Sequence, residues 1–183
     1  MMKIAMGQFA VERDWQHNAA TCIRLMSEAA AADAALLVLP EAVLARDNTD
    51  ANYVLKAAQP LNGPFVSQLL EASRNSRVTT IMSVPVPTEG GRALNVQIAI
   101  REGVIVARYD KLHLYDAFAV QESKNISAGE QVPALIEVGG MKVGLMTCYD
   151  VRFPELARRL AVDGAEVLVL PSAWLRGPLK EMH

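Results

Sequence analysis

Three chemically reactive side chains each follow a short apolar run of the sequence. Glu41 comes after residues 36–40, Lys111 after residues 104–110, and Cys148 after residues 142–147. Ligands of open α/β sheets collect at the carboxyl ends of strands, so three such runs can bring these side chains together. A cysteine with an ordinary pKa of about 8.5 carries little thiolate at neutral pH and needs a neighbouring base or cation. Glu41 can accept the thiol proton, and Lys111 can stabilise both a thiolate and the oxyanion formed when a carbonyl carbon is attacked.

The position of Cys148 is typical of a nucleophile elbow, a turn between a strand and a helix. An apolar strand ends just before it, and Pro154 begins an apparent helix. Such a turn displays the sulfur above the sheet, where the backbone N–H of Tyr149 can point at the same carbonyl oxygen. Each residue also has a plainer interpretation: Cys148 as packing, Glu41 as a solvated loop carboxylate and Lys111 as a surface lysine.

Strand-like and helix-like segments alternate along the chain, which predicts a mixed α/β fold in layers. Helices are expected at residues 15–32, 64–77 and 154–162. Strands are expected at residues 3–9, 35–39, 78–84, 94–100, 104–109, 134–138, 141–147 and 165–170. Asp14 is expected to cap the first helix, and the polar residues 110–131 are expected to form a functional or disordered loop because they lack periodicity.

Two ten-residue stretches resemble one another. DAALLVLPEA at residues 33–42 is matched by GAEVLVLPSA at residues 164–173. Each is interpreted as the end of a helix, an apolar strand and a proline. The match predicts two similar α-β halves whose strand ends face one another.

The composition predicts a globular protein of one domain, residues 1–183. Apolar residues make up 51% of the sequence and charged residues 21%, with a formal net charge of −2. Neither nucleic acid nor membrane is an expected partner, because there is no basic field and no membrane-spanning apolar run. The N-terminus shows no secretion signal, so the two cysteines, Cys22 and Cys148, are expected to stay reduced in the cytoplasm. The sequence contains no Cys/His cluster that predicts a metal site.

Three motifs resemble the signature regions of the nitrilase superfamily, the carbon–nitrogen hydrolases. They are LVLPEA with Glu41, YDKLHLYD with Lys111, and GLMTCYDVRFPELARRLAVDGAEVLVLPSAW with Cys148. The resemblance implies an α-β-β-α sandwich in which these three residues are catalytic and the cysteine forms a covalent acyl-enzyme. It also implies that Glu122 orients Lys111, that no metal or organic cofactor takes part, and that the protein forms a homo-oligomer.

Two stretches resemble one branch of that superfamily, which contains deaminated glutathione amidases and omega-amidases. They are QESKNISAGE at residues 121–130 and CYDVRFPE at residues 148–155. True nitrilases usually carry Trp-Glu after the cysteine, whereas this chain has Tyr149-Asp150, so a small nonpeptide amide is expected as substrate. Deaminated glutathione is preferred, with an acid and ammonia as expected products. Arg152 is a candidate for binding a substrate carboxylate, and its alternative is pairing with Glu155 or with solvent.

Members of this superfamily normally continue beyond the strand that contains LVLPSAW. The sequence is therefore expected to lack the C-terminal part of the sandwich, with residues 177–183 as the first turn of a further helix. An alternative function is then an inactive fragment or an interaction module with an exposed apolar surface. A third alternative is a Cys-His amidotransferase with His113 as base, which is disfavoured because Thr147 and Tyr149, not glycines, flank the cysteine.

Overall fold

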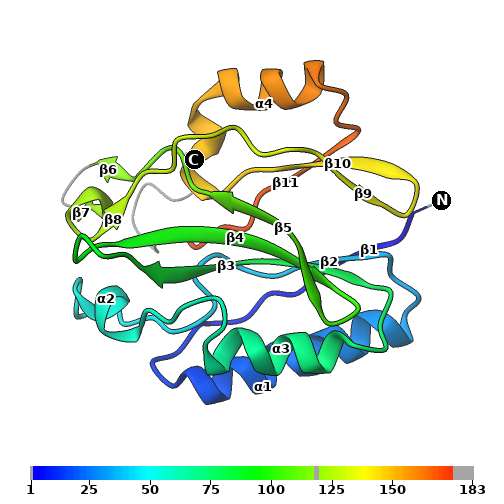
Figure 1. The fold of residues 1–183 in the computed structure, drawn as a ribbon, viewed down its shortest axis with the longest axis horizontal. Helices are drawn as coiled ribbons and strands as arrows, with labels where there is room; N and C mark the ends of the chain where they lie inside the picture. The colour runs from blue at the N-terminus through cyan, green and yellow to red at the C-terminus, as the bar shows by residue number, and fades with distance from the viewer. Residues whose placement is uncertain (1, 118–119, 175–183) are drawn as a thin grey trace.

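The protein has four layers in the order helix, sheet, sheet, helix (Figure 1). The structure, a computed structural model, describes residues 2–117 and 120–174. Helices α1 (Trp15–Ala31) and α3 (Pro64–Ser73) form one outer layer, and helix α4 (Pro154–Val162) forms the other. The predicted α-β-β-α sandwich is therefore confirmed, and the helix turn expected at residues 177–183 lies outside the described residues.

A six-stranded sheet and a three-stranded sheet form the two inner layers. The larger sheet has the order β1 (Ile4–Met6), β2 (Leu36–Val38), β3 (Thr79–Pro87), β4 (Ala93–Arg101) and β5 (Val104–Asp110), with β8 (Ile126–Ser127) beside β4. The smaller sheet has the order β11 (Val167–Val169), β10 (Met141–Leu145) and β9 (Ile136–Val138). Strands β1, β2 and β3 run parallel, as do β10 and β11, while β4 is antiparallel to both β3 and β5.

Two hydrophobic cores lie on either side of the larger sheet. Because successive strand residues point to opposite faces, Leu37 packs toward the helices and Leu36 toward the smaller sheet. The core under the helices also contains Cys22 and Phe65, and the core on the side of the smaller sheet also includes Leu160 of α4. Burial of apolar area on both faces fixes the larger sheet, and the loops at its end are held by this rigid frame.

Several predicted boundaries are corrected by the structure. Strand β1 is shorter than residues 3–9, and α3 ends at Ser73 instead of residue 77. Strand β3 continues past residue 84 to Pro87. Pro85 fits this strand because its carbonyl faces away from β4 and accepts from the backbone N–H of Gln59, so its missing N–H removes no β3–β4 hydrogen bond.

The polar segment of residues 110–131 contains more structure than its sequence indicated. It holds the short pair β6 (Asp116–Ala117) and β7 (Val120–Gln121), a 3-10 turn η1 (Glu122–Lys124) and strand β8. A short helix α2 (Tyr53–Ala57) was also not predicted. These elements are too short to produce a periodic pattern, so their conformation is set by contacts with the sheets.

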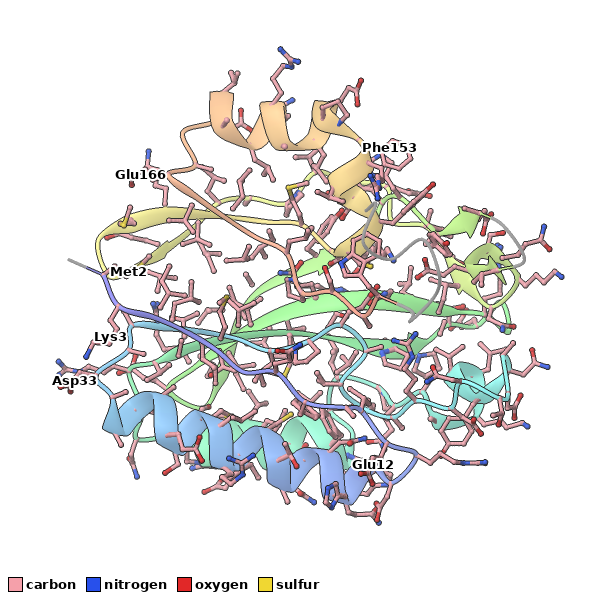
Figure 2. All side chains as sticks on the ribbon, turned by 180° about the vertical axis from the view of Figure 1, so that it is seen from behind. Met2, Lys3, Glu12, Asp33, Phe153 and Glu166 are labelled. Atoms are coloured by element: carbon pink, nitrogen blue, oxygen red, sulfur yellow. The ribbon has the colours of Figure 1, made fainter. Side chains whose placement is uncertain are left out.

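The two similar stretches of sequence do meet in space. The backbone N–H of Glu41, after β2, lies 3.5 Å from the carbonyl oxygen of Ser172, after β11. Figure 2 shows Phe153, just before α4, at the end of the sandwich opposite Met2 and Lys3. The strands that start near Met2 therefore deliver their carboxyl ends to the side on which Phe153 lies.

Candidate active site

Glu41, Lys111 and Cys148 come together at the carboxyl ends of β2, β5 and β10. The Lys111 Nζ atom lies 2.9 Å from Oε1 of Glu41, and the Cys148 thiol lies close enough to both groups for their charges to act on its pKa. All three residues are buried, with 7%, 2% and 7% of their surface exposed. The plainer interpretations of Glu41 as a solvated carboxylate and Lys111 as a surface lysine are therefore wrong.

Cys148 occupies a strained turn. Its φ of +46° lies in the left-handed region, which L-residues other than glycine, Asn and Asp rarely adopt. The turn is a 3-10 helix, η2 (Cys148–Arg152), which starts with a reciprocal capping box between Thr147 and Asp150. The backbone N–H of Cys148 donates to the carbonyl of Pro171, so the smaller sheet's last strand also holds the turn.

The backbone N–H of Tyr149 donates no hydrogen bond within the described part of the chain. It belongs to the first residues of a 3-10 turn, where amide groups have no partner inside the helix. An unsatisfied amide directly after the cysteine is available to an oxygen atom bound beside the sulfur.

Three donors hold the Glu41 carboxylate in one orientation. Lys111 Nζ and Asn95 Nδ2 both donate to Oε1, each at 2.9 Å. The backbone N–H of Ala173 donates to Oε2 at 3.1 Å. Ala42, the next residue, has a φ of +54° and donates its N–H to the Ser83 hydroxyl, so the loop that carries the glutamate is itself fixed.

Glu122 contacts Lys111 as the sequence predicted. Its two carboxylate oxygens lie 3.1 and 2.9 Å from the Lys111 ammonium. The backbone N–H of Tyr115 donates to the same carboxylate at 2.6 Å, and the N–H of Gly129 donates to the Lys111 carbonyl. The ammonium therefore lies between two carboxylates, one next to the thiol and one at the first residue of η1.

The charges of the site determine its resting protonation state. Burial would raise the pKa of the Glu41 carboxyl, but the Lys111 ammonium and three hydrogen bonds together hold it below its ordinary value. Burial would lower the pKa of Lys111, and the negative charges of Glu41 and Glu122 raise it instead. At neutral pH the site thus holds a carboxylate and an ammonium.

The thiol of Cys148 is neutral in this resting state. Burial and the Glu41 charge raise its pKa to about 12, and the Lys111 ammonium offsets this only in part. The Lys111 ammonium therefore does not by itself produce a thiolate at rest, because a buried negative sulfur next to a carboxylate is unfavourable. The thiol has to lose its proton to Glu41 as it attacks.

A buried network around Asp150 was missed by the sequence analysis. Its carboxylate accepts from the Tyr109 hydroxyl at 2.7 Å and from the Thr147 N–H at 2.8 Å. It also accepts from the backbone N–H of His113 at 3.2 Å, and its Oδ1 atom lies 2.7 Å from Nδ1 of that ring. Asp150 thereby links the cysteine turn to β5 and to the loop after Lys111.

His113 does not act on the thiol in this arrangement. Its ring stacks on Phe153 at a centroid distance of 3.8 Å, and its Nδ1 atom faces Asp150. Tyr149 places its ring against Tyr115 and Phe153. The Arg152 guanidinium lies over the Trp174 ring, 5.9 Å from its centroid. This leaves the glutamate as the base that contacts the sulfur.

No group of three or more His, Cys, Asp or Glu side chains among the described residues is arranged to hold a metal ion. Within those same residues, no helix combines the length and the apolar character needed to cross a membrane.

Comparison with known proteins identifies the family. The model of the carbon-nitrogen hydrolase family matches residues 3–181. The chain belongs to the carbon–nitrogen hydrolase family. It is 57% identical to a deaminated glutathione amidase of Escherichia coli O157:H7, over 100% of this chain and 70% of that protein. It is 32% identical to the deaminated glutathione amidase of Homo sapiens, over 96% of this chain and 57% of that protein.

A solved structure with the same fold gives a chemical parallel. A mutant amidase from Nesterenkonia sp. AN1 has a TM-score of 0.84 and 26% identity, over 98% of this chain and 68% of that one. In that protein the acetamide moiety of fluoroacetamide is covalently added at the active-site cysteine. The family of hydrolases to which this chain belongs therefore includes an amidase whose cysteine forms a covalent adduct.

Proposed function

We propose that the protein is an amidase that cleaves a small nonpeptide amide through a cysteine acyl-enzyme. The observation that carries this proposal is the buried cluster of thiol, carboxylate and ammonium at Cys148, Glu41 and Lys111, in which the ammonium is hydrogen-bonded to the carboxylate. Because the chain spans 70% of the bacterial relative and 57% of the human one, activity is a proposal for the chain itself.

The first chemical step is attack of the thiol sulfur on the amide carbon. As the S–C bond forms, the thiol proton passes to the carboxylate of Glu41, which touches the thiol in the resting state. The carbonyl oxygen becomes an oxyanion, and the Lys111 ammonium and the Tyr149 N–H are the donors available for it. Glu122 keeps the ammonium in place by accepting from its other side.

The second step breaks the C–N bond. Glu41 now carries the proton and returns it to the leaving nitrogen, so that a neutral amine departs and a thioester remains. A water molecule then attacks the thioester, with Glu41 again accepting a proton, and the acid leaves as the thiol is restored. One carboxylate serves both half-reactions because its hydrogen bonds to Lys111, Asn95 and Ala173 keep it in one position.

We propose deaminated glutathione as the substrate, supported by the 57% identical relative that bears this activity in its name. The amide nitrogen cleaved in deaminated glutathione belongs to its cysteine residue. The amine product is then the remaining dipeptide, which corrects the expectation of ammonia for this substrate. Arg152, exposed near Trp174, is proposed to bind a carboxylate of the substrate.

We propose a homo-oligomer in the cytoplasm as the working form. Free thiols at Cys22 and Cys148 suit a reducing compartment. The edge strands β1 and β11 expose Ile4, Met6 and Leu168, which gives an apolar surface for association. Light scattering on the purified protein measures the association state, and a monomer at micromolar concentration contradicts this part of the proposal.

The test of function is amide cleavage by the purified chain. Product acid and amine are measured with deaminated glutathione, with alpha-ketoglutaramate and with a nitrile, for the wild type and Cys148→Ala. We expect turnover of amides by the wild type alone, and an acyl group added to Cys148 that mass spectrometry detects. A folded wild-type chain without turnover favours the alternative of an inactive fragment or interaction module.

A further inference from the structure

We propose that Asn95 is a positioning residue that determines which oxygen of Glu41 removes the proton from Cys148. The inference deepens the proposed amidase function and rests on it. Asn95 has no role in any step of the chemistry described above except through the glutamate. It lies in β4, in the interior of the larger sheet, and only 6% of its surface is exposed.

The backbone of Asn95 is fixed before its side chain is considered. Its carbonyl accepts from the N–H of Lys111 at 3.0 Å, so β4 and the segment after β5 hold it in register. Its side-chain nitrogen then reaches two acidic groups, Oε1 of Glu41 at 2.9 Å and, at a longer 3.5 Å, Oε1 of Glu122. One amide thus contacts both carboxylates that flank the ammonium.

The hydrogen bonds divide the two oxygens of Glu41 into different roles. A carboxylate oxygen has two lone-pair directions, and both directions of Oε1 are taken by Lys111 and Asn95. Oε2 accepts one hydrogen bond, from the N–H of Ala173, and has one direction left. The segment 171–173, which donates to Oε2 through Ala173, also accepts the backbone N–H of Cys148 at the Pro171 carbonyl, so Oε2 lies on the side of the cysteine turn. In the proton transfer the S–H bond therefore breaks and an O–H bond forms at Oε2.

The orientation of the Asn95 amide follows from the surrounding charges. If the group were rotated by half a turn, its Oδ1 atom would face the carboxylates of Glu41 and Glu122. That orientation is unfavourable because the amide oxygen and the carboxylate oxygens repel one another. In the observed orientation Oδ1 is buried and has no hydrogen-bond partner within the described part of the chain. An unsatisfied buried oxygen is unfavourable, so its presence shows that the contact with the carboxylates outweighs it.

Gln97 provides a matched control for this amide. It lies two residues further along β4 on the same face, is fully buried, and carries the same functional group. Its side chain accepts from the hydroxyl of Thr147 at 2.9 Å instead of contacting the glutamates. Loss of Gln97 therefore removes a buried amide from the same layer without removing a donor from Glu41.

The experiment measures the pH dependence of Cys148 alkylation by iodoacetamide, followed by mass spectrometry of the peptide that contains Cys148. This reaction needs Glu41 to take the thiol proton but needs no amide hydrolysis. It therefore tests the role of Asn95 even if the wild type cleaves no substrate, in which case the proposed function alone fails. The kcat/KM profile for amide cleavage is recorded in parallel.

We expect Asn95→Ala to move the acid limb of both profiles to higher pH by about one unit, because a lost hydrogen bond to the ionised form raises the pKa of Glu41. Asn95→Asp, which has nearly the same shape but adds a negative charge, should move it further. Gln97→Ala should lower the alkylation rate and kcat/KM by the same factor at every pH. The pH at which the acid limb occurs should not change.

The proposal is overturned if the acid limb of both Asn95 variants coincides with that of the wild type, or if Gln97→Ala moves it as far. Should Asn95→Ala not fold, the near-isosteric Asn95→Asp decides. Failure of both to fold, with Gln97→Ala folded, also counts against the proposal, because Asn95 would then be required for the sheet and not for the orientation of the base.

Discussion

The two cysteines of this protein lie in different environments although their burial is similar. Cys22 belongs to α1 and packs in the core under the helices, and Cys148 is buried in the turn after β10. Burial raises the pKa of each thiol to about 12. What differs is the neighbourhood: Cys148 touches Glu41 and lies near Lys111, whereas hydrophobic side chains surround Cys22.

This comparison shows that a low pKa is not what marks the reactive cysteine here. A neutral thiol can still attack if a carboxylate accepts its proton during the step. Among the described residues no carboxylate acts on Cys22, and its side chain packs in the core under the helices. The backbone differs as well, since Cys22 is helical while Cys148 has a φ of +46°.

The largest expected difference between the two cysteines is in turnover. Cys148→Ala should lower kcat for amide cleavage by about 10⁴-fold or more, because no covalent intermediate can form. Cys22→Ala should keep kcat within about twofold while unfolding at lower urea concentration, because it leaves a small cavity. Steady-state kinetics and urea denaturation measure the two effects. Equal loss of turnover in both variants contradicts the assignment of the nucleophile.

A second way to test the comparison is to remove the base and keep the thiol. Glu41→Gln should lower kcat by roughly 10²- to 10⁴-fold, the usual contribution of a general base. It should also slow alkylation of Cys148 at neutral pH and remove the acid limb of that reaction, since the carboxylate proposed to take the thiol proton is gone. Alkylation of Cys22 in denaturant serves as the control and should be unchanged. An unaltered Cys148 alkylation profile excludes Glu41 as the base.

The cation between the two glutamates is expected to matter for stability as well as for rate. Lys111→Met leaves the buried Glu41 and the partly buried Glu122 without their partner, which should cost about 3–5 kcal/mol of unfolding free energy at pH 7. Because the Glu41 carboxylate loses its charge when it is protonated in acid, the deficit should shrink as the pH falls toward 4. Urea denaturation at several pH values measures this. A deficit independent of pH argues that lost packing, and not charge, is the cause.

The smallest expected effect distinguishes the backbone conformation at position 148 from that at position 22. At position 148, glycine should be more stable than alanine by about 1 kcal/mol, because it adopts a positive φ without steric cost. At position 22, inside a helix, glycine should be less stable than alanine by about the same amount. The four variants are compared by urea denaturation. The same sign at both positions contradicts the strained turn.

Much of the site was predictable because its main residues follow recognisable runs. Glu41, Lys111 and Cys148 each come at the end of an apolar strand, and Glu122 was inferred from the superfamily resemblance. Asn95 gave no such signal, since a polar residue inside a buried strand has many possible partners. Its contact with Glu41 spans 54 residues of sequence, and only the pairing of strands brings the two together.

The fold was predicted in its layers but not in its details. Long periodic segments such as α1 began where Asp14 indicated, because the cap is a local interaction. Residues 110–131 were expected to form a functional or disordered loop, and the structure shows that they contain β6, β7 and η1, which carries Glu122 against the ammonium. Asp150 likewise contacts Tyr109 and His113, which precede it by 41 and 37 residues. Such elements depend on tertiary contacts, which a single local pattern does not encode.

The hydrogen bond from Ala173 to Glu41 has a consequence for how the protein is made. Its two partners are 132 residues apart, and the ribosome delivers the N-terminal one first. A growing chain that has just exposed Cys148 still lacks the segment that seats the carboxylate beside the sulfur. Reactivity toward amides should thus arise late in synthesis, after Ala173 has left the exit tunnel. Until then, the incomplete site should not react with other molecules of the cell.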